Sequence, residues 1–198
     1  MSTPNLRSGV LTYPKPRQEH AELLLAWRTR PDITQYLLTD IEPDIEAQRR
    51  WLAACETKTG FVHRLIAVDD VPVGYCSITT TDEAAQIGTI GVYLAEKTSR
   101  SGIASFNFIH ILNHAFLTLG LYKLVNHIMG TNERVIRSQV MNGYRPVGIL
   151  REHAVKYGKR HDLHVFEQSR ADWLAHREKF KDYRDLDGIE RQGRLSEN

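Results

Sequence analysis

A polar turn joins a predicted strand to a predicted helix in the segment GVYLAEKTSRSGIASF, residues 91–106. Lys97 to Ser101 supply two cations and three hydroxyl groups, and Gly102 follows directly. The first turn of a helix has unpaired backbone N–H groups and the positive end of the helix dipole, so it favours an anion. Gly102 would let a phosphate approach the backbone, and Arg100 would add a positive charge. The segment therefore indicates an anion site, with an ordinary serine-capped helix as the alternative.

A second motif, HDLH at His161 to His164, has a spacing similar to that of metal ligands. The segment is predicted to be a strand, and successive strand residues point to opposite faces, so His161 and His164 would not share an ion. We therefore expect no metal site. Asp162 and His164 would share a face.

The composition places these motifs in one domain. The chain has 198 residues, and Lys+Arg 26 against Asp+Glu 24 gives no basic surface for nucleic acid. The two cysteines form no CxxC motif, which favours a reducing cytoplasm, and the N-terminus has no signal-type apolar stretch. No apolar run approaches the ~20 residues of a membrane span. We expect a single cytoplasmic domain over residues 1–180, followed by a charged tail over residues 181–198, with no membrane or nucleic-acid partner.

The elements that would position the turn alternate irregularly along the chain. Hydrophobic periodicity and turn residues predict the order β, α, α, β, β, β, α, β, α, β, β, α. Three strands precede the central helix without helices between them, so that part of the sheet must be antiparallel. The strand–helix–strand unit around residues 102–119 would be a right-handed parallel crossover. The predicted fold class is α/β (α+β), with a mixed, mostly antiparallel sheet.

The ordered motifs resemble those of the GCN5-related N-acetyltransferase (GNAT) superfamily over roughly residues 10–175. Residues 99–104, SRSGIA, match its signature Arg/Gln-x-x-Gly-x-Gly/Ala except at Ser99. Asn132, a short helix and Gly143-Tyr144 match its downstream pattern. The resemblance implies the GNAT fold, in which the fourth and fifth strands splay apart and helices cover both faces. WRTR at 27–30, IEAQRRW at 45–51 and the run from Gly148 to Asp162 resemble a narrower branch, the nucleotide-amino-sugar and ribosomal-protein N-terminal acetyltransferases.

By this resemblance the co-substrate is acetyl-CoA, and neither a metal nor a covalent enzyme intermediate is needed. A backbone N–H near Tyr93 would polarise the thioester carbonyl. The residues expected to bind acetyl-CoA are Val92 and Leu94 for the pantetheine, the backbone of Arg100, Ser101, Gly102, Ile103, Ala104 and Ser105 for the pyrophosphate, and Asn132 and Gln139.

The resemblance also suggests catalytic residues. His127 occupies the position of a glutamate base in some relatives, and histidine accepts a proton near neutral pH; an ordinary solvated histidine is the alternative. Gln139 replaces the usual tyrosine acid and could only donate a hydrogen bond to the sulfur. Ser138, Tyr93 or water would then protonate the thiolate, or it would leave unaided. Tyr93 is equally open to a packing role.

The acceptor is expected to be a primary amine, first of all on a nucleotide-linked amino sugar. The alternatives are the N-terminus of a ribosomal or other protein, another small amine, or a non-catalytic acyl-CoA-binding sensor of the same fold. The protein would be a monomer or a homodimer. The candidate acceptor-binding residues are Arg28, Tyr36, Thr79, Thr80, Asp162 and His164.

Overall fold

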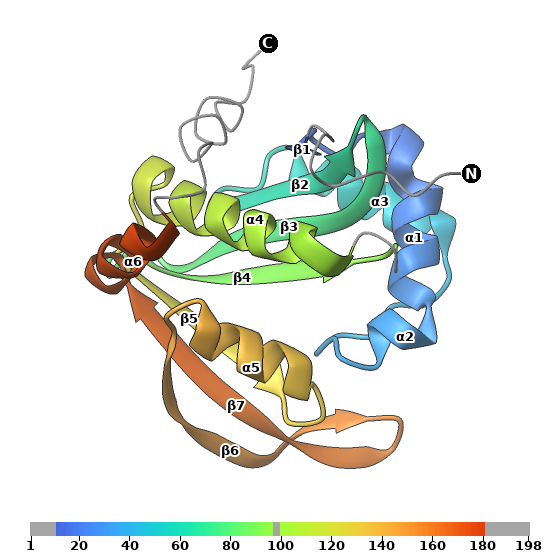
Figure 1. Cartoon of the computed structure of the whole chain (residues 1–198). Coiled ribbons are helices and arrows are strands. Elements are labelled where there is room, and N and C mark those ends of the chain that lie inside the picture. The colour runs from blue at the N-terminus through green and yellow to red at the C-terminus, as the bar shows by residue number, and fades with distance from the viewer. Residues whose placement is uncertain (1–10, 97–99, 181–198) are drawn as a thin grey trace.

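The computed structural model of the chain describes residues 11–96 and 100–180, and Figure 1 shows its elements. The helices are α1 (Ala21–Thr29), α2 (Pro31–Thr34), α3 (Ile45–Cys55), α4 (Arg100–Asn113), α5 (Glu133–Met141) and α6 (Arg170–Arg177), with 3-10 turns at Gln18–His20 and Glu178–Phe180 and a π-helical turn at His114–Thr118. The strands are β1 (Leu11–Thr12), β2 (Phe61–Val68), β3 (Val71–Asp82), β4 (Ile87–Leu94), β5 (Lys123–Met129), β6 (Arg145–Lys156) and β7 (Lys159–Ser169). The predicted order is confirmed, with α2 as an additional short helix. The predicted tail at 181–198 lies outside the described residues.

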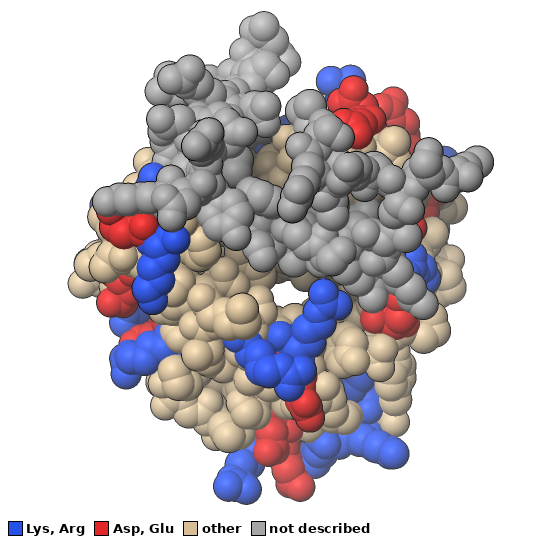
Figure 2. Space-filling view, in the orientation of Figure 1, with Lys and Arg blue, Asp and Glu red and all other residues tan. Residues whose placement is uncertain are grey.

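The described strands form one seven-stranded sheet in the order β1-β2-β3-β4-β5-β7-β6. All neighbours are antiparallel except β4 and β5, which run parallel around the crossover through α4. Figure 1 shows β5, β7 and β6 turning away from β4, and Figure 2 shows an opening through the molecule between β4 and α5. The predicted mixed, mostly antiparallel sheet is confirmed.

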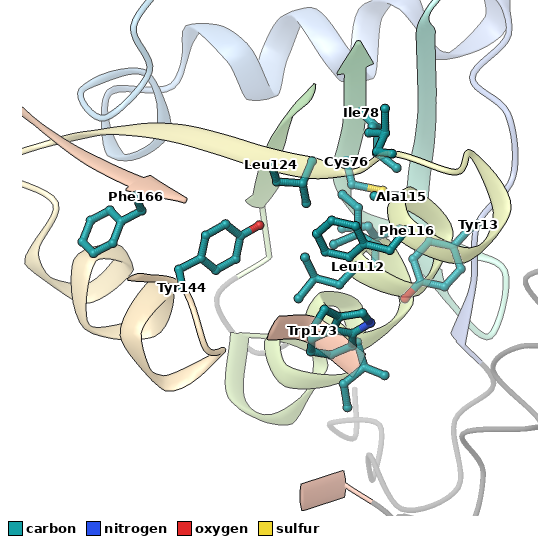
Figure 3. Packing of buried hydrophobic residues seen from close by; sticks show 14 of the residues in the cluster. Tyr13, Cys76, Ile78, Leu112, Ala115, Phe116, Leu124, Tyr144, Phe166 and Trp173 are labelled. Carbon is teal, nitrogen blue, oxygen red and sulfur yellow. The ribbon is translucent and has the colours of Figure 1, made fainter. Parts of the chain in front are cut away.

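Helices α4, α5 and α6 cover one face of this sheet. The core between them and the strands includes Leu112 of α4, Phe116 of the π-helical turn and Trp173 of α6, which Figure 3 shows packed together. Trp173 is completely buried, and its indole N–H donates to Asn113 Oδ1 at 2.9 Å. Because this hydrogen bond satisfies the indole, α6 can bury a large ring against α4.

Helices α1, α2 and α3 cover the other face, over β2 to β4. Leu24 and Trp27 of α1 and Leu52 of α3 are buried against Leu65 of β2. In β2, Leu65 faces this layer while Ile66 faces the α4 layer, so the strand is apolar on both sides. Both faces of the sheet are therefore covered in this half of the molecule.

Two tight turns form the β2–β3 and β6–β7 hairpins. Asp69 and Asp70 connect β2 to β3 with φ of 49° and 63°. Tyr157 and Gly158 connect β6 to β7 with φ of 49° and 71°. Positive φ at both positions is the pattern of a two-residue type I′ turn, whose twist suits antiparallel strands.

Candidate active site

Strands β4 and β5 pair at one end only. Their register has two positions, Ile87 opposite Lys123 and Gly88 opposite Leu124. Beyond Gly88, β4 continues to Leu94 without a further register position on β5. The sheet therefore consists of two arms, which are joined at the base of a split. One arm is β1-β2-β3-β4 and the other is β5-β7-β6.

Asn126 of β5 lies in the angle of this split. Its Oδ1 accepts hydrogen bonds from the backbone N–H of Ile90 and from the hydroxyl of Thr89, each at 3.1 Å. Its Nδ2 donates to Gln139 Oε1 on α5 at 3.2 Å. The side chain is 1% exposed, so a buried amide receives the Ile90 N–H where a strand carbonyl would otherwise do so. The sequence did not predict this role of Asn126, because one asparagine within a strand pattern gives no signal of it.

The backbone of β4 beyond Ile90 is open on the β5 side. In an antiparallel strand each residue directs its N–H and its C=O to the same neighbouring strand, and the next residue directs them to the opposite neighbour. Ile90 directs its N–H to β5, so Val92 and Leu94 do the same, while Tyr93 is paired with Tyr75 of β3. An extended ligand can add to this edge as a strand would. The N–H predicted near Tyr93 to polarise a carbonyl is therefore that of Val92 or Leu94, since the N–H of Tyr93 faces β3.

The strand-to-helix joint follows the open edge. β4 ends at Leu94 and α4 begins at Arg100, so a helix N-terminus lies where the signature predicts it. Ser99 and the side chains of Arg100 to Ser105 lie outside the described part of the molecule. Phosphate binding at this helix N-terminus stays a prediction.

A pocket of about 570 Å³ lies beside β4, between α1, α3 and the residues 35–44 that connect α2 to α3. Residues 35–44 are called the acceptor connector below. The apolar and aromatic lining consists of Leu24, Ile41, Ala47, Trp51, Tyr75 and Tyr93, and the polar lining of Arg28, Thr39, Glu42, Asp44 and Gln48. The volume is that of a pocket for one small molecule.

Three aromatic rings form one wall of the pocket. Tyr75 and Tyr93 are stacked, with ring centroids 5.5 Å apart, and the ring of Trp51 lies 6.5 Å from that of Tyr75. The hydroxyl of Tyr75 lies 3.3 Å from Nδ1 of His63. Burial raises the pKa of both tyrosines far above the usual value and lowers the pKa of His63 to about 4. Both hydroxyls therefore stay protonated, and His63 stays neutral, near neutral pH.

Polar side chains hold the opposite wall. Arg28 Nη2 donates to the carbonyl and the hydroxyl of Thr39, at 3.2 and 3.0 Å. Its Nε is buried and has no hydrogen-bond partner among the described residues. Asp44 caps α3 by accepting the N–H groups of Glu46 and Ala47. With Glu42 exposed in the same wall, the lining carries two carboxylates and one guanidinium.

The profile of a family described as an acetyltransferase (GNAT) domain matches residues 11–145. The chain belongs to this GNAT acetyltransferase family. A search of the curated proteins finds no match. The family match confirms the predicted superfamily and acetyltransferase activity, and it does not extend to the narrower amino-sugar or ribosomal branch.

Solved structures share the fold of this acetyltransferase. A spermidine N-acetyltransferase from Vibrio cholerae, in complex with CoA and spermine, is similar with a TM-score of 0.78 and 13% identity, over 83% of this chain and 98% of that chain. A putative acetyltransferase from T. thermophilus is similar with a TM-score of 0.72 and 19% identity, over 87% of this chain and 93% of that chain. The predicted GNAT fold with splayed strands is thereby confirmed.

Within the acetyltransferase, the two predicted catalytic residues lie on the same side of the sheet. His127 is exposed and lies between Asn126 and Ile128, and Ile128 packs into the α4 layer, so His127 faces the opposite side. Tyr93 lines the pocket on that side, which α1 to α3 cover. The two residues belong to different arms of the split sheet.

Two predicted cofactor-binding side chains have structural partners. Gln139 is 2% exposed and accepts the amide of Asn126. Asn132 caps α5, because its Oδ1 accepts the N–H of Val135 at 3.4 Å. Both side chains support elements that border the split.

The predicted acceptor residues are dispersed in the structure. Of these six, Arg28 alone lies in the described lining of the pocket; Tyr36 is exposed just after α2. Thr79 and Thr80 lie inside β3, opposite Thr89 and Gly88, and neither lines the pocket. The other two predicted residues lie on β7.

Asp162 and His164 lie on β7 away from the pocket. Asp162 Oδ1 accepts the backbone N–H of Glu152 at 2.8 Å. His164 is opposite Ile128 in the β5–β7 register, so its side chain shares the α5 side of the sheet rather than the side of His127. The sequence did not predict the lining residues Trp51, Tyr75, Glu42 and Asp44, because their patterns are also those of core packing and helix capping.

The described residues contain no cluster of three or more histidine, cysteine, aspartate or glutamate side chains that could hold a metal ion. None of the described helices is long and apolar enough to cross a membrane.

Proposed function

We propose that this acetyltransferase transfers the acetyl group of acetyl-CoA to the primary amine of a small acceptor that binds in the pocket beside β4. One observation carries the proposal. Tyr93 lines the pocket with its side chain, while Val92 and Leu94 direct their backbone groups into the split. Donor and acceptor sites therefore meet across a single strand.

The residues of the split suit an acetyl-CoA molecule. Val92 and Leu94 would pair with the pantetheine amides, and the first turn of α4 would hold the pyrophosphate. The acetyl thioester is an activated acyl group, so an amine can attack its carbonyl carbon while the C–N bond forms and the C–S bond breaks. The N–H of Val92 or Leu94 would stabilise the negative charge that develops on the carbonyl oxygen.

His127 of β5 is the residue that we assign to proton transfer, and Tyr93 of β4 would give only a hydrogen bond. His127 faces the pocket side and would accept the proton that the attacking amine loses. Tyr93 would donate a hydrogen bond to the sulfur without losing its proton, because burial raises the pKa of Tyr93 far above that of a thiol. The thiolate would therefore leave as such and take its proton from solvent.

The acceptor that the sequence favours is a nucleotide-linked amino sugar. A sugar ring suits the apolar and aromatic wall formed by Trp51, Tyr75 and Tyr93. Its phosphates would lie outside the pocket, because Glu42 and Asp44 would repel them.

A polyamine is a second candidate, and the charge of the lining favours it. Glu42 and Asp44 would attract a second ammonium group, and the rings of Trp51 and Tyr75 would accept a cation over their faces. A solved structure of the same fold, the Vibrio cholerae enzyme, holds spermine.

Thiol release with three acceptors tests the proposal: a uridine-diphosphate-linked amino sugar, spermidine, and a peptide that begins with Ala or Ser. We expect release with at least one of the two small amines and none with the peptide. Glu42→Gln should raise KM for spermidine about five-fold or more while leaving KM for the amino sugar within about two-fold. Glu56→Gln, an exposed change at the other end of α3, is the control and should alter neither. Release with the peptide alone would favour protein N-terminal acetylation instead.

A further inference from the structure

Lys156, the last residue of β6, has a buried side chain that crosses to the other arm of the sheet. It is 3% exposed, although lysine is rarely buried to this degree. Its Nζ donates to the carbonyl of Leu37 at 3.1 Å, to the carboxylate of Asp40 and to the hydroxyl of Thr34 at 3.4 Å. The three N–H donors of the ammonium group thus have three acceptors, all on α2 and the acceptor connector.

The shape of the β6–β7 hairpin brings Lys156 to this position. The register between the strands shifts between Leu150 and Ala154, and Glu152 has a φ of 50° within this bulge. Asp162 of β7 accepts the N–H of Glu152 and so holds the bulge. A bulge bends its strand and increases its twist, and in Figure 1 the end of the hairpin curves toward α2.

This contact closes the open end of the split sheet. At the base, β4 and β5 are joined through Ile87 and Gly88. At the far side, Lys156 joins the hairpin of the second arm to the acceptor connector of the first. The two arms are thus connected both at the base of the split and through Lys156.

We propose that Lys156 is a positioning residue that straps the acceptor connector to the β6–β7 hairpin and thereby fixes the pocket wall relative to β5. The connector supplies Thr39, Ile41 and Glu42 to the pocket. Through β7 and β5, the strap also sets the distance between that wall and His127. The consequence for acceptor binding rests on the proposed function of the pocket.

A strap of this kind makes a prediction that a purely stabilising ion pair does not. Releasing the connector should weaken acceptor binding. The pocket wall would then become ordered only when the acceptor binds, and the entropy lost in this step reduces the binding free energy. It should leave acetyl-CoA binding unchanged, because the hydrogen bonds of Lys156 to described residues go to Thr34, Leu37 and Asp40 and not to β4.

The test compares Lys156→Met with Lys156→Arg, Asp40→Asn and a matched control, Lys159→Met, which removes an exposed lysine from the same hairpin. Hydrogen exchange of residues 35–42 reports the strap directly. Steady-state kinetics with spermidine and with the uridine-diphosphate-linked amino sugar report the pocket, and calorimetry with CoA reports the donor site.

For Lys156→Met we expect exchange of residues 35–42 and KM for the acceptor to rise about ten-fold, with kcat and CoA affinity within about two-fold. Lys156→Arg should recover part of the loss, and Lys159→Met should match the wild type. Asp40→Asn, a change at an exposed position, should shift both readouts in the same direction and keeps the test available if Lys156→Met does not fold.

Unchanged exchange in both Lys156→Met and Asp40→Asn would overturn the strap. Faster exchange with unchanged KM, or equal losses in KM, kcat and CoA affinity, would overturn its role in positioning the pocket. A wild type that turns over neither probe would contradict the proposed acceptors, and the exchange measurement would still decide whether the strap exists.

Discussion

Asn126 on β5 accepts the backbone N–H of Ile90 on β4 at 3.1 Å, at the level where the two strands part. The Asn126 side chain lies between the backbones of β4 and β5 and holds them farther apart than a direct backbone hydrogen bond would. It also satisfies the buried N–H that this separation would leave without a partner. The separation of β4 from β5 is therefore supported by a specific residue before any ligand binds.

Replacing Asn126 with Leu should destabilise the protein and weaken donor binding. The Ile90 N–H and the Gln139 amide would each lose a buried partner, at about 1–3 kcal/mol per group, so we expect a loss of about 2–6 kcal/mol in urea unfolding. Asn107→Leu is the matched control, because Asn107 is equally buried but its amide has no partner among the described residues. A similar loss in both variants would contradict this role for Asn126.

Asn126 and Gln139 should also be energetically coupled. Their side-chain amides are joined at 3.2 Å, and both are buried. In a double-mutant cycle with Leu at each position, we expect a coupling energy of about 0.5–3 kcal/mol in unfolding free energy. Additive losses would show that Gln139 does not act through Asn126, and would leave its amide available to the sulfur of the donor.

The sequence predicted the fold better than the acceptor side of the site, for a physical reason. The elements follow from local patterns, such as the apolar residues spaced three and four apart in the helix that includes Ile109, whereas Val92 was expected to bind the donor only from the family resemblance. The pocket instead depends on contacts between distant segments. Lys156 meets Asp40 across 116 positions of sequence, and no local pattern encodes that contact.

Asp162 illustrates the same limit. Its place on a strand suggested an acceptor-binding residue, because strand alternation tells which face a side chain takes but not what lies on that face. In the structure it holds the N–H of Glu152 in a bulge, and bulges depend on the pairing partner as well as on the strand itself. Trp51 is the opposite case, because it lines the pocket but was not predicted to do so. An aromatic residue on a helix has the same sequence pattern whether it lines a pocket or packs in a core.

Replacing His127 with Ala should slow acetyl transfer in a pH-dependent way. If His127 accepts the proton of the amine, its loss should lower kcat about 100-fold near neutral pH, and the rate should recover at alkaline pH, where the free amine predominates. His164→Ala is the matched control, because His164 lies on the adjacent strand and faces the other side of the sheet. Equal pH profiles of wild type and His127→Ala would remove His127 from the mechanism.

Replacing Tyr93 with Phe should leave most of the activity. Burial raises the pKa of the Tyr93 hydroxyl, so proton transfer from it to a thiolate is unfavourable, and only a hydrogen bond would be lost. We expect kcat to fall less than about ten-fold, as one neutral hydrogen bond of about 1 kcal/mol implies. Tyr93→Ala should cost more, through the stacking on Tyr75 and the edge contact with Trp27. A fall of more than about 100-fold in Tyr93→Phe would indicate a proton donor.

His63, which holds the hydroxyl of Tyr75, should make stability depend on pH. Burial, and to a lesser extent the charge of Arg64, lowers the pKa of His63 to about 4 from the ordinary value of 6.5. Between these values the unfolded chain binds a proton that the folded protein does not, so stability is lost as pH falls from 6.5 toward 4. His63→Asn cannot titrate there and keeps a polar partner for Tyr75, so its urea midpoint should fall less than that of the wild type between about pH 7 and about pH 4.5. His110, whose pKa burial also lowers, to about 3, is present in both proteins and cancels in the difference. Parallel curves for the two proteins would mean that His63 does not titrate between its folded and unfolded values.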